Sequence, residues 1–159
     1  NVFNLLKQIA SGKFIMIGTG NNSKSMAYVG NVAAFIYDRA IKMERGSNIF
    51  NYVDKPDFTM NGLVSKVDDI LKKKTTKIKV PKFLGMFIGY ILDIVSVIFQ
   101  REFNVSAIRV KKFCATTQYN ADKMHSHFVP PYSLIEGLEK TITYEFIDKN
   151  GDDIFFFSE

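Results

Sequence analysis

Apolar residues recur along this chain with the periods of helices and short strands. A helix with one buried face carries apolar residues three and four positions apart, and a short strand shows an alternating or continuous apolar run. These patterns predict helices at residues 2–10, 32–40, 59–73, 83–99, from 106 onward, 121–126 and 133–146, and short strands at 14–17, just before the second helix, and at 48–53, 76–80 and 118–119. Short strands that alternate with helices predict a mixed α/β fold.

Polar residues mark where several of these elements begin or end. Thr59 is a predicted N-cap, and Ser133 with Glu136 has the spacing of a capping box. We expect Asn120 to cap the short helix that follows it, and Asp54–Asp57, which contains a proline, to end the strand before it.

The most apolar segment of the chain is Phe83–Phe99. A helix that crosses a membrane needs roughly 20 apolar residues, whereas this run is shorter and carries Asp93 near its middle. We therefore expect a buried or partner-facing helix here rather than a transmembrane span. An exposed helix of this composition would form an adhesive apolar patch.

The 159 residues suit one domain (1–159), and 47% apolar with 23% charged residues is typical of a globular protein. The net charge of +5 comes mostly from scattered lysines, whose runs are too short for a nucleic-acid-binding arm. The single cysteine, Cys114, suits a reducing compartment such as the cytoplasm. The chain lacks an initiator methionine and starts directly with an amphipathic pattern, so we expect a fragment of a longer protein.

The stretch best suited to ligand binding is Phe14–Ile36, in which a polar loop of Gly, Asn and Ser residues lies between apolar elements. Lys24 is the cation of this loop, and we expect it to meet an anionic ligand. Asn1, in the first turn of the first helix, either meets an anion or caps the helix. A solvated connection is the alternative for such a loop, and composition does not decide between them.

The sequence shows no catalytic or metal-binding constellation. It contains no Gly-rich dinucleotide loop ahead of a helix, no Walker loop and no HExxH motif. Cys114, His125 and His127 are too isolated for a zinc site, which needs three or four ligands, so we predict no metal and treat the histidines as ordinary polar residues. The chain by itself therefore offers no catalytic apparatus.

The order of several short motifs resembles a known enzyme family. The motifs are NVFNLL followed by IASGK, then F-x-MIG-x-GNN, S-x-AYV-x-NVAAF and IFNYVDKP, and late in the chain ATTQYNADK. In this order they are similar to the carboxy-terminal portion of an extended short-chain dehydrogenase/reductase of the NAD-dependent epimerase/dehydratase group, which acts on nucleotide sugars. The similarity covers nearly all of the chain and is weakest across Phe83–Phe113.

The resemblance implies a small mixed α/β substrate-binding domain that lacks the Rossmann domain of its enzyme. The absent amino-terminal domain would hold NAD or NADP and the catalytic residues. The substrate would be a nucleotide diphosphate sugar, and the leading activity is that of a UDP-sugar 4-epimerase acting through a 4-keto intermediate. We expect a cytoplasmic parent enzyme, with a homodimer as one option, and with neither nucleic acid nor membrane as a partner.

The resemblance also assigns substrate contacts. Asn1 matches an asparagine that meets the nucleotide diphosphate, and Lys24 matches a position where many members carry an arginine for the diphosphate. Lysine keeps the charge of arginine but cannot donate two parallel hydrogen bonds to a phosphate as the planar guanidinium does. Arg109 and Lys112 lie where members supply a second cation, and the sequence does not choose between them. Asn31 replaces a commoner aspartate, and we expect it to cap a helix.

Two other functions remain open at this point. A membrane-associated, hydroxysteroid dehydrogenase-like reductase would use Phe83–Phe99 as a membrane-contacting helix. A non-enzymatic binding module would bind no nucleotide sugar at all.

Overall fold

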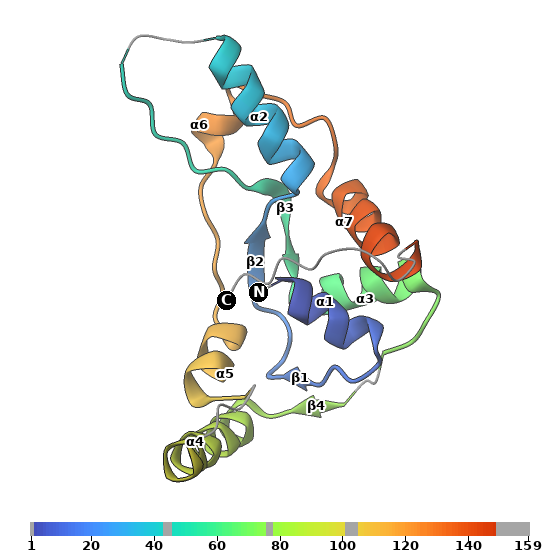
Figure 1. The fold of residues 1–159 in the computed structure, drawn as a ribbon, viewed down its shortest axis with the longest axis vertical. Coiled ribbons are helices and arrows are strands. Elements are labelled where there is room, and N and C mark those ends of the chain that lie inside the picture. Colours follow the sequence, from blue (N-terminus) through green and yellow to red (C-terminus); the bar gives the residue numbers. More distant parts are fainter. Residues whose placement is uncertain (1, 43–45, 76–77, 101–104, 149–159) are drawn as a thin grey trace.

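The computed structural model describes residues 2–42, 46–75, 78–100 and 105–148, and these residues form the expected mixed α/β fold (Figure 1). Helices outnumber strands, and every strand is short. The elements are α1 (Val2–Ala10), β1 (Met16–Ile17), β2 (Ser23–Met26), α2 (Val29–Ile41), β3 (Asp54–Thr59), α3 (Met60–Leu71), β4 (Lys79–Val80), α4 (Lys82–Phe99), α5 (Ala107–Cys114), α6 (Asp122–His125), α7 (Leu134–Ile142) and the π-helical turn η1 (Thr143–Ile147).

The strands form two separate two-stranded sheets. β1 and β4 run parallel, with Met16 opposite Lys79, so their carboxyl ends lie side by side. β2 and β3 run antiparallel, with Lys24 opposite Phe58 and an irregular register beyond that pair. The other edge of β2 meets a single bridge at Thr117. These pairings join segments that are far apart in the sequence.

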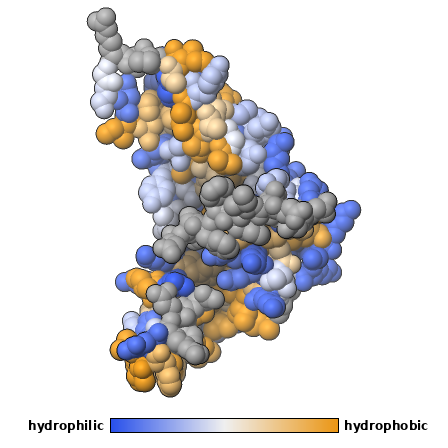
Figure 2. Space-filling view, in the orientation of Figure 1, coloured by the Kyte–Doolittle hydropathy of each residue, from blue (hydrophilic) through white to orange (hydrophobic). Residues whose placement is uncertain are grey.

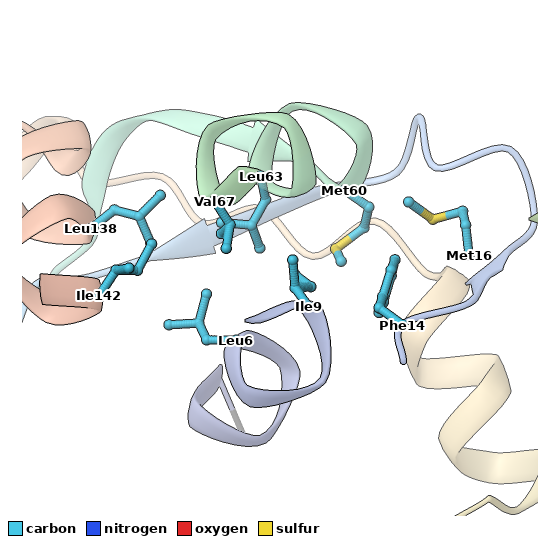
Figure 3. Packing of buried hydrophobic residues seen from close by; sticks show 9 residues of the cluster. All are labelled: Leu6, Ile9, Phe14, Met16, Met60, Leu63, Val67, Leu138 and Ile142. Carbon is cyan, nitrogen blue, oxygen red and sulfur yellow. The ribbon is translucent and has the colours of Figure 1, made fainter. Parts of the chain in front are cut away.

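The main hydrophobic core lies between α1, α3 and α7 (Figure 3). Leu6 and Ile9 of α1 point toward Leu63 and Val67 of α3, and Ile142 of α7 closes the cluster. All five side chains are at most 2% exposed. Within each helix they are three or four residues apart, which is the spacing that places side chains on one helix face. The apolar pattern of the sequence therefore predicted this core correctly.

The predicted N-caps Thr59 and Ser133 are confirmed, whereas the N-cap of α6 is Ala121 and not Asn120 as predicted. The Thr59 hydroxyl accepts a hydrogen bond from the Gly62 amide at 3.0 Å. Ser133 and Glu136 form a complete capping box at the start of α7, with the Glu136 carboxylate accepting from the Ser133 amide at 2.7 Å. Ser133 also holds the pKa of the Glu136 carboxyl below its usual value, through hydrogen bonds from its amide and its hydroxyl.

Replacing Ser133 with alanine should lower the free energy of unfolding by about 1 kcal/mol, because the first turn of α7 loses its cap. Denaturant unfolding of the intact protein measures this change. Ser126→Ala is a suitable control, since the Ser126 hydroxyl bonds to the carbonyl of Lys123 on the short helix α6. If Ser133→Ala costs no more than Ser126→Ala, the capping box contributes little to stability.

Three strand predictions differ from the structure. Residues 48–53 form no strand, and β3 instead runs through the predicted breaker Asp54–Asp57. Pro56 is tolerated because β3 pairs only with β2 among the described residues, so its other edge needs no amide donor. The predicted loop Ser23–Ser25 belongs to strand β2, and the predicted strand at 118–119 is reduced to the bridge at Thr117.

The apolar helix is present as α4, and of the two alternatives expected for it, a buried or a partner-facing helix, burial is wrong. Only 11% of its residues are buried. Asn31 is also not a helix cap: it lies inside α2 and is fully buried, while Tyr28 occupies the cap position. The apolar run at 154–157, which the sequence favours as buried or paired, lies outside the described residues.

Candidate functional site

A cavity of about 720 Å³ opens at the carboxyl ends of the parallel strands β1 and β4. Ligands bind preferentially at such strand ends in α/β proteins, because the loops that follow the strands converge there. The cavity is lined by Ile17, Gly18, Thr19, Asn21, Asn22, Lys79, Val80, Pro81, Lys82 and Cys114.

The loop after β1 is held in a fixed conformation at the rim of this cavity. Gly18 and Gly20 have φ angles of +83° and +75°, which glycine adopts without strain. The Gly18 amide donates to the Val80 carbonyl at 2.8 Å. Asn61, in the first turn of α3, donates from its side chain to the Thr19 carbonyl at 2.9 Å and to the Asn21 side chain at 3.0 Å. The loop backbone is therefore fixed before any ligand arrives.

The carboxyl end of α5 closes another side of the cavity. The Asn22 side chain donates to the Phe113 carbonyl at 2.8 Å. The Cys114 thiol lies 3.4 Å from the Ile17 carbonyl and accounts for the only cysteine of the chain. These contacts join residues more than ninety positions apart, so the cavity exists only in the folded chain.

Two lysines give the cavity its positive charge. Lys79 begins β4 and lines the cavity, and its ammonium lies 3.3 Å from the Thr19 carbonyl. Lys82 is the first residue of α4, where the free amides of the helix also favour an anion. The described lining residues include no carboxylate. Neither lysine was predicted from the sequence; their positions in a short strand and at a helix start, on either side of Pro81, are the signal that could have indicated them.

Lys24, the first candidate from the sequence, does not line this cavity. Its ammonium donates to the Lys112 carbonyl at 2.8 Å and lies 3.4 Å from the Thr117 hydroxyl. Partial burial lowers the pKa of Lys24, and the nearby Cys114 partly opposes that effect. Lys24 thus attaches β2 to the end of α5.

The other sequence candidates are only partly brought together. Lys112 meets Lys24 through its backbone carbonyl, and its side chain is exposed. Arg109 is exposed and lies one turn earlier on α5. Neither side chain lines the cavity, and Asn1 lies outside the described residues. Lys24, Arg109 and Lys112 do share the α5 side of the structure.

A buried polar network fixes the start of α2. The Asp54 carboxylate accepts from the Tyr28 amide at 2.7 Å, from the Asn31 side chain at 3.0 Å and from the Tyr52 hydroxyl at 3.1 Å. Asn31 also exchanges two hydrogen bonds with the backbone of Tyr132. Burial, and then the neighbouring Asp54 charge, raise the pKa of Tyr52. The network joins α2, β3 and the segment before α7.

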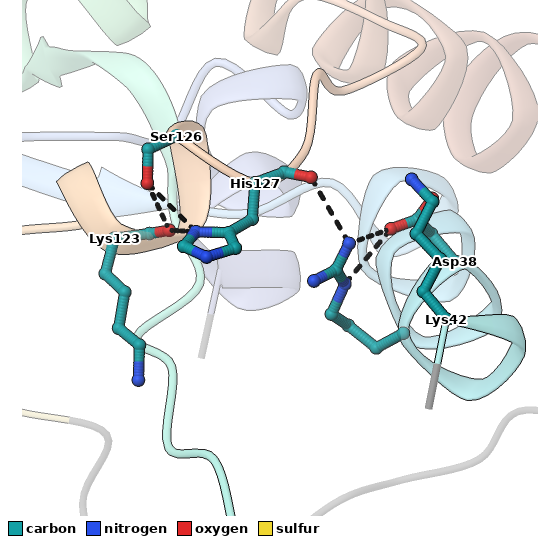
Figure 4. A network of polar contacts seen from close by, with 6 residues as sticks. Asp38, Lys42, Lys123, Ser126 and His127 are labelled. Atoms are coloured by element: carbon teal, nitrogen blue, oxygen red, sulfur yellow. Dashed lines mark hydrogen bonds and ion pairs between the residues drawn. The ribbon is translucent and has the colours of Figure 1, made fainter. Parts of the chain in front are cut away.

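The two histidines lie near α6. His127 contacts the Lys123 carbonyl at 2.7 Å, and its own carbonyl accepts from Arg39, which pairs with Asp38 (Figure 4). His125 borders a second cavity of about 440 Å³, and its buried Nε2 atom has no hydrogen-bond partner. Across the part of the chain that the structure describes, no three His, Cys, Asp or Glu side chains are grouped to hold a metal ion.

The chain is similar to sugar epimerases and dehydratases, as its motifs indicated. No family model matches the chain.

One similar protein is the N-acetyl-α-D-glucosaminyl-diphospho-ditrans,octacis-undecaprenol 4-epimerase of Escherichia coli O157:H7. It is 53% identical over 160 residues, and the alignment covers all of this chain and 48% of the relative. The chain therefore spans about half the length of this protein.

Two solved structures share the fold. The UDP-glucose 4-epimerase of Thermotoga maritima, solved with UDP-glucose, is 19% identical with a TM-score of 0.56, covering 91% of this chain and 38% of that one. The dTDP-glucose 4,6-dehydratase of Bacillus anthracis, solved with NAD, is 18% identical with a TM-score of 0.53, covering 89% and 37%.

Proposed function

We propose that this chain is the substrate-binding part of an NAD(P)-dependent 4-epimerase whose substrate is a sugar attached to a diphosphate. The observation that carries the proposal is the 53% identity, along the whole chain, to a protein named as a 4-epimerase. A cavity with two lysines and no carboxylate among its described lining residues suits the diphosphate.

The carrier of the sugar is named differently in the two epimerases that the chain resembles. The Escherichia coli relative is named for a sugar linked through a diphosphate to undecaprenol, a lipid, whereas the Thermotoga maritima structure contains UDP-glucose. Both names describe a sugar attached to a diphosphate. The UDP-sugar predicted from the sequence is therefore one form of the proposed substrate class, and a lipid-linked sugar is the other.

The described residues do not fit the dinucleotide itself. Gly18-Thr19-Gly20 follows a strand, as a dinucleotide loop does, but it leads into strand β2 instead of a helix whose amino end could hold the pyrophosphate. We propose that NAD or NADP, which would accept and return a hydride, is held by other residues of a longer enzyme. The described residues bind and orient the diphosphate, and a cytoplasmic location remains part of the proposal.

The function is tested by incubating the intact protein and NAD with UDP-N-acetylglucosamine, and separately with N-acetylglucosaminyl diphosphate on a polyprenol. The proposal expects the C4 epimer of at least one substrate, with no net consumption of NAD. A 4-keto-6-deoxy product or stoichiometric consumption of NAD(P)H would show a dehydratase or a reductase instead. Absence of substrate binding would indicate a non-enzymatic module.

Replacing Lys82 with glutamine should raise KM for the diphosphate sugar about tenfold, equivalent to about 1.4 kcal/mol, while NAD affinity stays unchanged. The reason is that Lys82 lies at the cavity and at the start of a helix, where charge removal weakens anion binding. Lys66→Gln is a matched control, because Lys66 is exposed on α3 and does not line the cavity.

The same assay compares the cavity with the site expected from the sequence. Lys24→Met removes the ammonium that was predicted to meet the diphosphate. If Lys24→Met raises KM more than Lys82→Gln does, the diphosphate binds on the α5 side, near Arg109 and Lys112, and the strand-end cavity is not its site.

A further inference from the structure

α4 presents a long apolar face that no other described element covers. By length and composition the helix could cross a membrane, with a mean hydropathy of 1.9. Figure 2 shows apolar side chains gathered over α4 at the lower end of the molecule. The most exposed of them, between 58% and 80% exposed, are Phe83, Phe87, Tyr90, Ile94, Val97, Ile98 and Phe99.

The opposite face of α4 is built for close packing against the protein. Gly85 and Gly89 lie one turn apart and are buried. A Cβ atom at Gly85 would come within 2.7 Å of the Ile17 side chain, and one at Gly89 within 2.6 Å of the Ala107 amide. One turn further, the Asp93 carboxylate accepts from the Ala107 amide at 3.0 Å and so caps α5. This packing fixes the rotation of α4 and directs its apolar residues outward.

Positive charge lies next to α4. α5, which packs on α4, carries Arg109, Lys111 and Lys112, and Lys79 and Lys82 lie just before α4 and at its start. Within residues 78–100 and 105–114 the single acidic residue is Asp93, and it is bonded to α5. An apolar helix face beside a cluster of lysines and arginines is typical of helices that lie on anionic membranes.

We propose that the outward face of α4 lies on an anionic lipid bilayer. This inference rests on the proposed function and assigns its substrate to the lipid-linked form. Pro81 and Lys82 both begin α4 and line the strand-end cavity. A diphosphate in that cavity is therefore beside the membrane-contacting helix, and its lipid chain continues into the bilayer.

α4 lies in the membrane surface rather than across the bilayer. A spanning α4 would carry α5, with its three cations, into the hydrocarbon, where each charge costs several kcal/mol. A helix in the interface buries only its apolar face and leaves the cations at the level of the lipid head groups. This proposal replaces the expectation from the sequence that a membrane is not a partner.

Vesicle co-sedimentation of the intact protein tests the membrane contact. The protein should bind vesicles of phosphatidylcholine and phosphatidylglycerol in equal amounts, and bind weakly to phosphatidylcholine alone. Replacing Phe87, Ile94 and Val97 together with serine should weaken binding at least tenfold, and Lys111→Gln about fivefold on anionic vesicles only. A matched control replaces Ile36, Ile41 and Val129, which are 61%, 64% and 84% exposed elsewhere, with serine and should bind normally.

Three results would overturn the membrane proposal. The first is absence of vesicle binding by the unaltered protein. The second is a dimer in analytical ultracentrifugation that the α4 triple variant converts to a monomer, without vesicle binding, which would assign the face to a second copy. The third is strong hydrogen-exchange protection of α4 without lipid and without vesicle binding, which would assign it to another part of the protein.

Activity separates this inference from the proposed function. The α4 triple variant should lose at least tenfold in turnover of the polyprenol-linked sugar in vesicles and keep its turnover of a water-soluble, short-chain analogue. Epimerisation without vesicle binding would contradict the membrane contact of α4 and leave the proposed 4-epimerase function standing. Vesicle binding without epimerisation of any diphosphate sugar would contradict the 4-epimerase function and leave the membrane contact standing.

Discussion

Replacing Asp54 with asparagine should lower the free energy of unfolding by about 3 kcal/mol, although the side chain keeps its size. Asp54 is 2% exposed and accepts hydrogen bonds from three donors, on Tyr28, Asn31 and Tyr52. An asparagine has one acceptor oxygen, so its amino group must face at least one of these donors. Urea unfolding of the intact protein measures the loss.

Tyr52→Phe is the control for this prediction, because it removes one of the three donors and leaves the carboxylate in place. It should cost about 1 kcal/mol at neutral pH. A cost for Asp54→Asn that is no larger would mean that the network adapts to the amide and does not fix the start of α2.

The Tyr52→Phe variant also tests how stability depends on pH. The folded-state pKa of Tyr52 is raised, so its contribution to stability is complete below the unfolded value of about 10 and is lost as the pH rises above it. Unaltered protein should therefore lose stability on alkaline titration more steeply than Tyr52→Phe. Equal slopes would show that Tyr52 ionises as readily in the folded as in the unfolded protein.

Replacing Gly20 with alanine should destabilise the protein by about 3 kcal/mol and raise KM for the diphosphate sugar. The φ angle of +75° costs a residue with a side chain about 1–2 kcal/mol. The new methyl group would also come within 2.7 Å of the Asn61 side chain, which must then move and release the Thr19 carbonyl. Denaturant unfolding and initial-rate kinetics measure the two effects.

Two further variants divide these causes for Gly20. Gly12→Ala shares the positive φ angle but has no atom within 4 Å of the added methyl group, so it should cost only about 1 kcal/mol and leave KM unchanged. Combining Asn61→Ala with Gly20→Ala removes the steric conflict. The double variant should therefore lose less free energy of unfolding than the sum of the losses of the two single variants. Full additivity would show that Asn61 does not restrain the loop.

The proposed role of the chain follows from the position of the loop, the lysines and α4 around one cavity. Asn61 and Gly20 shape the loop at the strand-end cavity, Lys79 and Lys82 charge it, and the apolar face of α4 starts at its rim. A cavity for a diphosphate beside a membrane-contacting helix suits a sugar carried on a lipid. The stability and kinetic measurements above test the loop independently of the vesicle measurements on α4.

The sequence correctly predicted the features that local patterns determine. Leu6 and Ile9 have helical spacing on their own helix, and Thr59 and Ser133 cap theirs through residues three positions away. The motif order also indicated the epimerases and dehydratases that the chain resembles. These interactions need only a few neighbouring residues, so a linear pattern contains the information.

Only the tertiary structure decided which segments form the site. β1 pairs with β4 across about sixty residues, which brings Gly18 next to Lys79 and Lys82, and the Lys24 ammonium binds the Lys112 backbone 88 positions away. The sequence also did not determine whether α4 is buried or exposed, because an apolar run contains no information about which other segment packs against it. Local propensity fixes the elements, whereas long-range packing chooses their neighbours, and the cavity, its charge and its exposed apolar border depend on those neighbours.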